Sequence, residues 1–442
     1  MEKILGLLRE ELEPEELRFL CAFWTELGYE IICPPPGSSK RPTVPLWCGT
    51  RPGTEEIRLR LSHCRMAGRD IWRLRQLTGE SVRKIRSAIV PIRKKSLRKF
   101  VSIGTIREKT GGVKMEYWVV DHKHIFKPEE LYLESHASTI ECLADGTLVA
   151  AWFGGTKEKH DDVAIWYSRY LDGKWEPQRK AADVEGVPCW NPALFDAGDR
   201  LVLYYKVGKT IPMWQTYYVE SVDGGATWST GKELVPGDFG GRGPVKNKCI
   251  RLQDGAILAP ASTETEEVWN CFTDRSEDNG HTWTRSPDVP IAREKLQYKG
   301  IIQPTLWQDT AGTVHMFTRS TEGAIFHSAS QDGGRSWSQA EPTELPNNNS
   351  GIDLTRLEDG RLVLVYNPIR GNWGKRSPIV FSISEDNGKT WGREYYLDHV
   401  PCDQKERWAN FSYPAIISRG KDLYITYTWK RETIAFWHIR LA

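Results

Sequence analysis

The octet Ser221-Val-Asp-Gly-Gly-Ala-Thr-Trp228 decides the fold, because closely similar octets recur along the chain at almost even spacing. Successive copies start 55, 54 and 54 residues apart and keep Ser first, Asp third, Gly fifth, Ser or Thr seventh and Trp last: Ser276–Trp283, Ser330–Trp337 and Ser384–Trp391. A fixed period of this length indicates one supersecondary unit that is repeated in space. The sequence therefore predicts a repeat fold.

The chemistry of the octet predicts a tight turn between two strands. Asp followed by Gly-Gly or Asn-Gly favours such a turn, because the carboxylate accepts hydrogen bonds from backbone N–H groups and Gly takes positive φ. We expect the closing Trp to bury its apolar face against the next unit.

The number of units follows from two independent repeats. A degenerate octet, Ser168–Trp175, begins 53 residues before Ser221. Six hairpins with strand-like flanks have turns at Asp145-Gly146, Gly198-Asp199, Asp254-Gly255, Ala311-Gly312, Asp359-Gly360 and Gly420–Asp422. The last unit is one strand short, and the run Met115–Val120 is the expected partner. Residues 115–442 are predicted to form an all-β, six-bladed β-propeller of four-stranded blades. A small, mainly α-helical region, residues 1–114, is predicted to precede it.

The four complete octets match the Asp-box pattern, Ser-x-Asp-x-Gly-x-Ser/Thr-Trp. Residues 115–442 resemble the sialidase-like (BNR or Asp-box) β-propeller superfamily, in particular its bacterial and fungal "sialidase-like" branch, which includes rhamnose-glucuronate lyases. Further segments that carry this resemblance are Ser135–Thr139, Ala151–Thr156, Asp162–Trp166, Gln303–Thr305, Asn349–Asp353 and Ser412–Pro414. In this superfamily the Asp boxes are scaffold on the face away from the active site, so they identify the fold rather than the reaction.

Polar residues stand where the first strand of each predicted blade begins and the second ends. In a propeller these positions converge on one mouth. The candidate substrate-binding residues are Asn191, Lys206, Lys246, Asn247, Lys248, Gln303, Arg319, Asn349, Ser350, Asp353, Asn367, Trp429 and Lys430. Cations predominate among the charged residues predicted at this mouth, although residues 115–442 hold 37 Lys and Arg against 45 Asp and Glu. This distribution favours an acidic oligosaccharide as the partner, for example one ending in a sialic or uronic acid. The alternative is that several of these lysines point into solvent.

The resemblance implies catalytic roles, and the sequence departs from it at one position. Sialidases bind the substrate carboxylate with three arginines, and His136 stands where the first is expected. Asp161 or Asp162 corresponds to the general acid, and Tyr413 with Glu264 partly matches the nucleophile pair.

Three functions therefore remain open. A hydrolase would use the acid and the nucleophile pair. A lyase would neutralise a uronate carboxylate with cations and remove the C5 proton with His136 or His160. His160 is alternatively a solvated loop residue. The third function is that of a non-catalytic glycan-binding propeller.

The first 114 residues show no trace of the repeat. An amphipathic helix is expected over Pro14–Leu27, and residues 51–114 hold 18 Lys and Arg against 5 Asp and Glu. Within them, Asp70–Ile89 resembles a helix-turn-helix with Gly79 in the turn, which would make nucleic acid a partner. Basic charge alone gives only non-specific affinity for nucleic acid. A third interpretation is that translation starts at Met115 and that the preceding residues are upstream sequence read in frame.

Composition and short motifs give the expected compartment. The first eight residues have too short an apolar run for a signal peptide, and no transmembrane stretch follows. Nine cysteines without zinc-type spacing indicate reduced thiols in a cytoplasmic protein. We expect no metal, no cofactor and no membrane partner.

Overall fold

The chain divides into two compact units, Met1–Ile103 and Gly104–Ala442. The structure, a computed structural model, describes residues 58–66, 69–77, 89–91, 117–400 and 410–442. The predicted domain boundary between residues 114 and 115 lies outside the described residues and stays a prediction.

The described part of the first unit is a three-stranded antiparallel sheet. Its strands are β1 (Arg58–Met66), β2 (Arg69–Leu77) and β3 (Ile89–Pro91). The helix-turn-helix predicted over residues 70–89 is therefore wrong in its first helix, because β2 pairs along its whole length with β1. Basic and apolar residues alternate with the period of a strand in Arg73-Leu-Arg75 of β2, as they do in Arg58-Leu-Arg-Leu61 of its partner β1. The mainly α-helical character predicted for the region is absent from its described elements, and residues 14–27 lie outside them.

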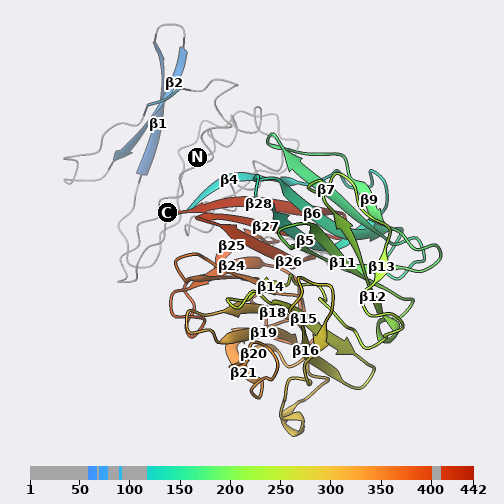
Figure 1. The fold of residues 1–442 in the computed structure, drawn as a ribbon. Coiled ribbons are helices and arrows are strands. Elements are labelled where there is room, and N and C mark those ends of the chain that lie inside the picture. Colours follow the sequence, from blue (N-terminus) through green and yellow to red (C-terminus); the bar gives the residue numbers. More distant parts are fainter. Residues whose placement is uncertain (1–57, 67–68, 78–88, 92–116, 401–409) are drawn as a thin grey trace. The chain divides into compact units, whose positions relative to one another are not determined.

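The second unit is the predicted propeller, and Figure 1 shows its sheets. The first three blades consist of β5 (Glu134–Cys142), β6 (Leu148–Gly155), β7 (Ala164–Leu171) and β8 (Lys174–Trp175); β10 (Cys189–Asp196), β11 (Leu201–Val207), β12 (Gln215–Ser221) and β13 (Lys232–Glu233); and β14 (Ile250–Arg251), β15 (Ile257–Glu264), β16 (Trp269–Ser276) and β17 (Thr284–Arg285). A fifth strand, β9 (Arg179–Ala182), pairs with β7 in the first blade.

The other three blades complete the ring. They consist of β18 (Ile301–Gln308), β19 (Val314–Ser320), β20 (Ala324–Ser330) and β21 (Glu341–Pro346); β22 (Asp353–Arg356), β23 (Leu362–Tyr366), β24 (Ile379–Ser384) and β25 (Tyr395–Asp398); and β26 (Phe411–Arg419), β27 (Asp422–Trp429), β28 (Thr433–Leu441) and β4 (Tyr117–His124). Two short 3-10 turns, η2 (Ile211–Met213) and η3 (Arg293–Lys295), lie in the connections.

The last blade is closed by the first strand of the propeller, as predicted. Strand β4 pairs antiparallel with β28, from Tyr117 opposite Leu441 to His124 opposite Ala435, and the two strands lie side by side in Figure 1. Joining the two ends of the repeat region in one sheet supplies the fourth strand of the last blade and ties the two ends of the propeller together.

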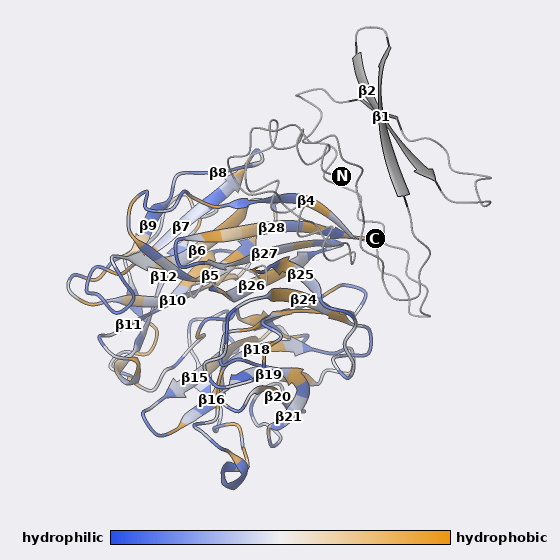
Figure 2. Ribbon diagram, turned by 180° about the vertical axis from the view of Figure 1, so that it is seen from behind, coloured by the Kyte–Doolittle hydropathy of each residue, from blue (hydrophilic) through white to orange (hydrophobic). Residues whose placement is uncertain are grey.

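The hydrophobic core lies between neighbouring blades. One cluster joins Val149 and Ile165 of the first blade to Leu203 of the second, and others join the next pairs around the ring. Strands β6, β11 and β23 are buried at every residue because a blade covers each of their faces. Figure 2 accordingly shows hydrophobic colour concentrated in the strands and hydrophilic colour in the loops.

Each Asp box is a turn that is held by hydrogen bonds among its recurring Ser, Asp, Gly and Ser or Thr residues. In the first, Asp223 Oδ1 accepts from Ser221 Oγ (2.7 Å) and Thr227 N (2.9 Å), and Gly225 takes a φ of 77°. The same bonds recur around Asp278, Asp332 and Asp386. The tryptophans pack on the preceding blade rather than the next one, which corrects the prediction: Trp228 contacts Tyr167, and Trp283 contacts Tyr204.

Candidate active site

Six residues with positive φ, one in each blade, form what we call the axial ring: Ala137 (56°), Asn191 (42°), Lys246 (71°), Gln303 (51°), Asn349 (57°) and Tyr413 (54°). Each lies in or just before the first strand of its blade, and β5 contacts β10 and β26, while β22 contacts β18 and β26. In β5, β10, β18 and β26 the residue lies at a break in strand pairing. Such bulges re-aim side chains, and a positive φ strains a residue other than glycine. The mouth, the end of the propeller opposite the Asp boxes, is therefore built on a backbone feature repeated in all six blades.

Three members of the axial ring hold one arginine. Arg319, at the end of β19, is only 3% exposed. Its Nη1 donates to Tyr413 Oη (2.6 Å) and Gln303 Oε1 (3.0 Å), and its Nε donates to Asn349 Oδ1 (2.7 Å). Blades four, five and six thus orient one guanidinium against one phenol oxygen.

Two further arginines lie near this pair. The guanidinium of Arg376 is 5.3 Å from the Tyr413 ring centre. Burial lowers the pKa of Arg376 to about 10. Its donors are little used within the described residues, where its side chain makes one long hydrogen bond, from Nη1 to Ser412 Oγ at 3.5 Å. A partly buried guanidinium with unused donors is suited to bind a carboxylate.

The third arginine comes from a strained turn between β27 and β28. The turn closes with a bond from Glu432 N to Trp429 O, and its two central residues, Lys430 and Arg431, have φ of 54° and 64°. Positions of this kind usually hold Asn-Gly. Arg431 Nη1 donates to Glu158 Oε2 (2.6 Å). We call Arg319, Arg376 and Arg431 the arginine cluster.

His136 is buried beside Tyr413, with the ring centres 4.2 Å apart. Its Nδ1 lies 2.8 Å from Thr428 Oγ1. Burial lowers the pKa of His136 well below its ordinary value, and the cations of the arginine cluster and Lys246 lower it further. These causes favour the neutral imidazole and make it a weaker base than an exposed histidine.

The predicted acids occupy two different environments. Burial raises the pKa of Glu264, at the end of β15, although Arg319 and Lys299 oppose this. His160, Asp161 and Asp162 are exposed on the loop between β6 and β7. Burial acts to raise the pKa of Asp162, but hydrogen bonds from Thr156 N (2.9 Å) and Oγ1 (2.6 Å) outweigh it and lower the pKa.

Several predicted substrate-binding residues direct their polar atoms into the protein. Lys206 is 0% exposed and donates to Thr216 Oγ1 (2.6 Å) and Arg242 O (2.8 Å). Lys248 forms an ion pair with Asp353 (2.8 Å). The other contacts are Asn247 with Gln303 O and Pro304 O, Asn367 with Pro378 O and Phe411 O, Trp429 with Asp398, and Lys430 with the Trp429 ring. Ser350 Oγ is buried without a hydrogen-bond partner.

The sequence prediction missed Arg376, Arg431, Glu158 and Trp373. Trp373 is 66% exposed, has a φ of 58°, and lies with its ring centre 5.8 Å from the Arg319 guanidinium. Two signals in the sequence could have identified them. One is the loop Gly371–Arg376, which carries Trp and Arg between two strands, and the other is the basic pair Lys430-Arg431 at a hairpin turn. No group of three or more His, Cys, Asp or Glu among the described residues is arranged to hold a metal. No helix within the described residues is long and apolar enough to cross a membrane.

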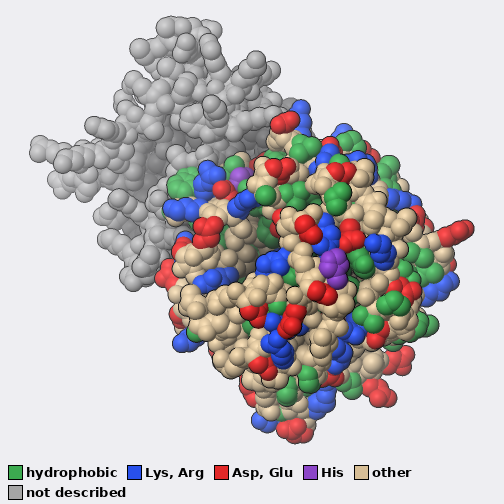
Figure 3. Space-filling view, in the orientation of Figure 1, with side chains coloured by type: hydrophobic (Ala, Val, Ile, Leu, Met, Phe, Trp, Pro, Cys, Tyr) green, Lys and Arg blue, Asp and Glu red, His purple; other side chains and the backbone are tan. Residues whose placement is uncertain are grey.

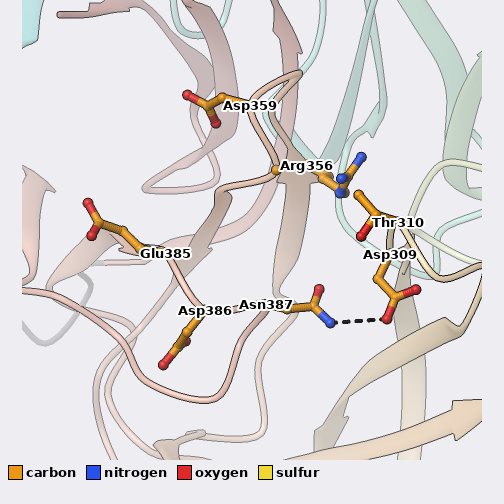
Figure 4. Close-up of a pocket in the computed structure, with 8 residues that line it drawn as sticks. Asp309, Thr310, Arg356, Asp359, Glu385, Asp386 and Asn387 are labelled. Atoms are coloured by element: carbon orange, nitrogen blue, oxygen red, sulfur yellow. Dashed lines mark hydrogen bonds between the residues drawn. The ribbon is translucent and has the colours of Figure 1, made fainter.

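A separate cavity of about 360 Å³ lies at the Asp-box end, between the fourth and fifth blades. Its lining includes Asp309, Arg356, Asp359, Glu385 and Asp386, and Figure 4 shows Asn387 turned toward Asp309. The lining is rich in carboxylates, so it does not suit an acidic ligand. Figure 3 shows both signs of charge interspersed on the visible face of the propeller.

The family of BNR repeat-like domains matches residues 146–425. The chain belongs to this family. A protein of unknown function from Dyadobacter fermentans is 16% identical, with a TM-score of 0.59 and coverage of 74% of this chain and 99% of that one. The Hadza microbial sialidase Hz136 is 14% identical (TM-score 0.61, coverage 83% and 73%), and the K499G mutant of NanB sialidase from Streptococcus pneumoniae is 12% identical (TM-score 0.56, coverage 72% and 70%). At these identities the likeness shows the fold alone. No curated protein matches the chain.

Proposed function

We propose that this sialidase-like propeller is an enzyme that cleaves the glycosidic bond of a terminal acidic sugar and reacts at the carbon bearing the carboxylate. The observation that carries the proposal is the 2.6 Å bond from Arg319 to the Tyr413 oxygen, with two more arginines beside it. A carboxylate that accepts hydrogen bonds from Arg319 would lie close to the Tyr413 oxygen, because the same guanidinium also donates to that oxygen. The carbon attached to that carboxylate is therefore the substrate atom that Tyr413 reaches most directly.

Hydrolysis on this geometry requires a sugar whose anomeric carbon carries the carboxylate, as in sialic acids. Tyr413 Oη forms a bond to that carbon while Glu264 accepts the phenol proton. The bond from that carbon to the leaving oxygen breaks, and the leaving oxygen takes a proton from Asp161, because the Thr156 hydrogen bonds favour the ionised form of Asp162. Water then attacks the glycosyl-enzyme with Asp161 as base, and Tyr413 leaves with the proton that Glu264 returns. The names of several structural neighbours, which are sialidases and trans-sialidases, support this route.

Elimination is a second candidate, favoured by neutral His136 beside Tyr413. The arginine cluster would neutralise a uronate carboxylate and so acidify the C5 proton. His136 would take that proton, the bond between C4 and the leaving oxygen would break, and Tyr413 would protonate that oxygen. The product is a 4,5-unsaturated uronate.

Incubation with a sialyl oligosaccharide and with a rhamnose-glucuronate oligosaccharide tests the proposal and separates the routes. Hydrolysis releases the acidic sugar, whereas elimination creates an ultraviolet-absorbing unsaturated uronate. Arg319→Met should abolish turnover, and Arg356→Met, at the Asp-box end, is the matched control. Absence of turnover would overturn the proposal. Binding of the oligosaccharide without turnover would instead support the function of a non-catalytic glycan-binding propeller. A cytoplasmic location also stays a prediction, which fractionation of native cells would test.

A further inference from the structure

Lys246 of the axial ring is a buried lysine whose donors are all used within the protein. It is 1% exposed. Its Nζ donates to Asn247 Oδ1 (2.7 Å), Ile352 O (2.9 Å) and Pro414 O. An ammonium group has three donors and no acceptor, so these bonds exhaust its capacity.

The partners of Lys246 belong to the blades that build the Tyr413 site. Ile352 directly precedes β22 of the fifth blade, and Pro414 directly follows Tyr413 in β26 of the sixth. The neighbouring Asn247 donates to Gln303 O (3.1 Å) and Pro304 O (2.9 Å) in the fourth blade. Lys246 and Asn247 therefore bond to backbone carbonyls of the fourth, fifth and sixth blades, the same three blades whose residues hold Arg319.

The lysine side chain and the tyrosine ring also pack around one glycine. A methyl group added at Gly351 would lie 3.1 Å from Lys246 Cε and 3.4 Å from Tyr413 Cγ. A displacement of the Lys246 side chain would therefore also displace the Tyr413 ring, because close-packed interiors transmit such shifts.

The charge at this position is expensive to bury. Burial lowers the pKa of Lys246 to about 7, opposed by Asp353 and aided by Lys248 and Arg319. An apolar side chain of similar size would fill the same space but would leave Asn247 Oδ1, Ile352 O and Pro414 O without this donor. A buried acceptor that loses its hydrogen bond is destabilising, so the lysine is needed for these bonds rather than for its volume.

We propose that Lys246 is a positioning residue for Tyr413. Its bonds to the fifth and sixth blades hold the Tyr413–Pro414 segment at the distance from which the phenol oxygen accepts the Arg319 hydrogen bond. The catalytic meaning of this role rests on the proposed function, whereas the positioning itself does not.

The test compares Lys246→Met with Lys206→Met. Lys206 is an equally buried lysine of the second blade, bonded to Thr216 Oγ1 and to the carbonyls of Gly241 and Arg242, and burial lowers its pKa to about 7 as well. 3-Fluorotyrosine placed at position 413 reports its surroundings by ¹⁹F NMR without any substrate. We expect Lys246→Met to shift or broaden this resonance and Lys206→Met to leave it unchanged.

On a substrate that the wild type turns over, Lys246→Met should lower kcat by about 10²-fold with KM nearly unchanged, since misplacement of about 1 Å has such an effect. An unchanged resonance and kcat, or equal changes in both lysine variants, would overturn the proposal. If Lys246→Met does not fold, Gly351→Ala presses on the same contact and should move the resonance. A shifted resonance in a protein without turnover would support the positioning and reject the proposed function.

Discussion

At the Asp-box end, four blades repeat both the backbone and the side chains, whereas at the mouth all six blades repeat the backbone and vary the side chains. Each complete Asp box bonds its own Ser, Gly and Thr in the same way, as around Asp223 and Asp278. The axial ring instead holds Ala, Asn, Lys, Gln, Asn and Tyr at one strained position.

The difference separates two kinds of constraint. An Asp box satisfies its own backbone locally, so the same octet serves in any blade. A strained residue persists only where the surrounding structure requires it, and such positions cluster at functional sites. Because the side chains at the six strained positions vary, they can place different chemical groups around one asymmetric ligand. We therefore expect substitutions at the mouth to affect chemistry and those in the Asp boxes to affect stability.

The largest effect is expected for Tyr413→Phe. It removes the oxygen that accepts the Arg319 bond and that reacts in both proposed routes, so kcat should fall by about 10³-fold or more. Kinetics on the active substrate measure this. Tyr366→Phe is the control, because Tyr366 is also buried and its hydroxyl bonds Glu394 (3.1 Å). Comparable losses in both variants would contradict a chemical role for Tyr413.

A smaller effect is expected for Arg376→Met. Hydrogen bonds to charged groups contribute about 1.5–3 kcal/mol, so the affinity for the acidic sugar should fall roughly 10- to 150-fold. Titration calorimetry with the acidic monosaccharide measures it, and the effect should weaken if the neutral methyl ester replaces the acid. An equal loss for acid and ester would show that Arg376 does not bind the carboxylate.

The sequence predicted the propeller because its signals are local. The octet period, the hairpin turns and the strand at Met115–Val120 each depend on neighbouring residues, and six blades closed by β4 are confirmed. The helix-turn-helix prediction was wrong in its first helix because it gave weight to a turn signal at Gly79 and not to the strand-like alternation in Arg73-Leu-Arg75.

The candidate site was only partly predictable because its contacts join distant segments. Tyr413 and Arg319 are 94 residues apart, and Arg431 and Glu158 are 273 apart. Side-chain direction also decides whether a polar residue faces a ligand or a backbone carbonyl, and positive φ re-aims it. Lys206 and Lys246 were therefore indistinguishable in the sequence from mouth-facing lysines.

A pH-dependent effect on stability is expected from His136. Its pKa in the folded protein is well below about 6.5, the unfolded value, so the unfolded chain binds more protons between the two. The free energy of unfolding should therefore fall as the pH drops below about 6.5, by up to about 1.4 kcal/mol per unit. His136→Gln should lack this component in urea unfolding, whereas exposed His160→Gln is the control. Parallel curves for His136→Gln and the wild type would show that His136 is not held neutral.

The smallest effect, and the one that tests the other end of the molecule, is expected for Asp223→Ala. The change removes the acceptor of the Thr227 bonds, and comparable capping carboxylates contribute about 1 kcal/mol. Those bonds lower the pKa of Asp223 to about 2, below the unfolded value of about 4, so the stabilisation exists above pH 4 and is lost as the pH falls toward 2. Urea unfolding should show that the free energy of unfolding of Asp223→Ala lies below that of the wild type at pH 7 and that this gap is smaller at acid pH. The kcat should be unchanged. A fall in kcat without a loss of stability would mean that the Asp-box end also shapes the mouth, and the two ends would then not be independent.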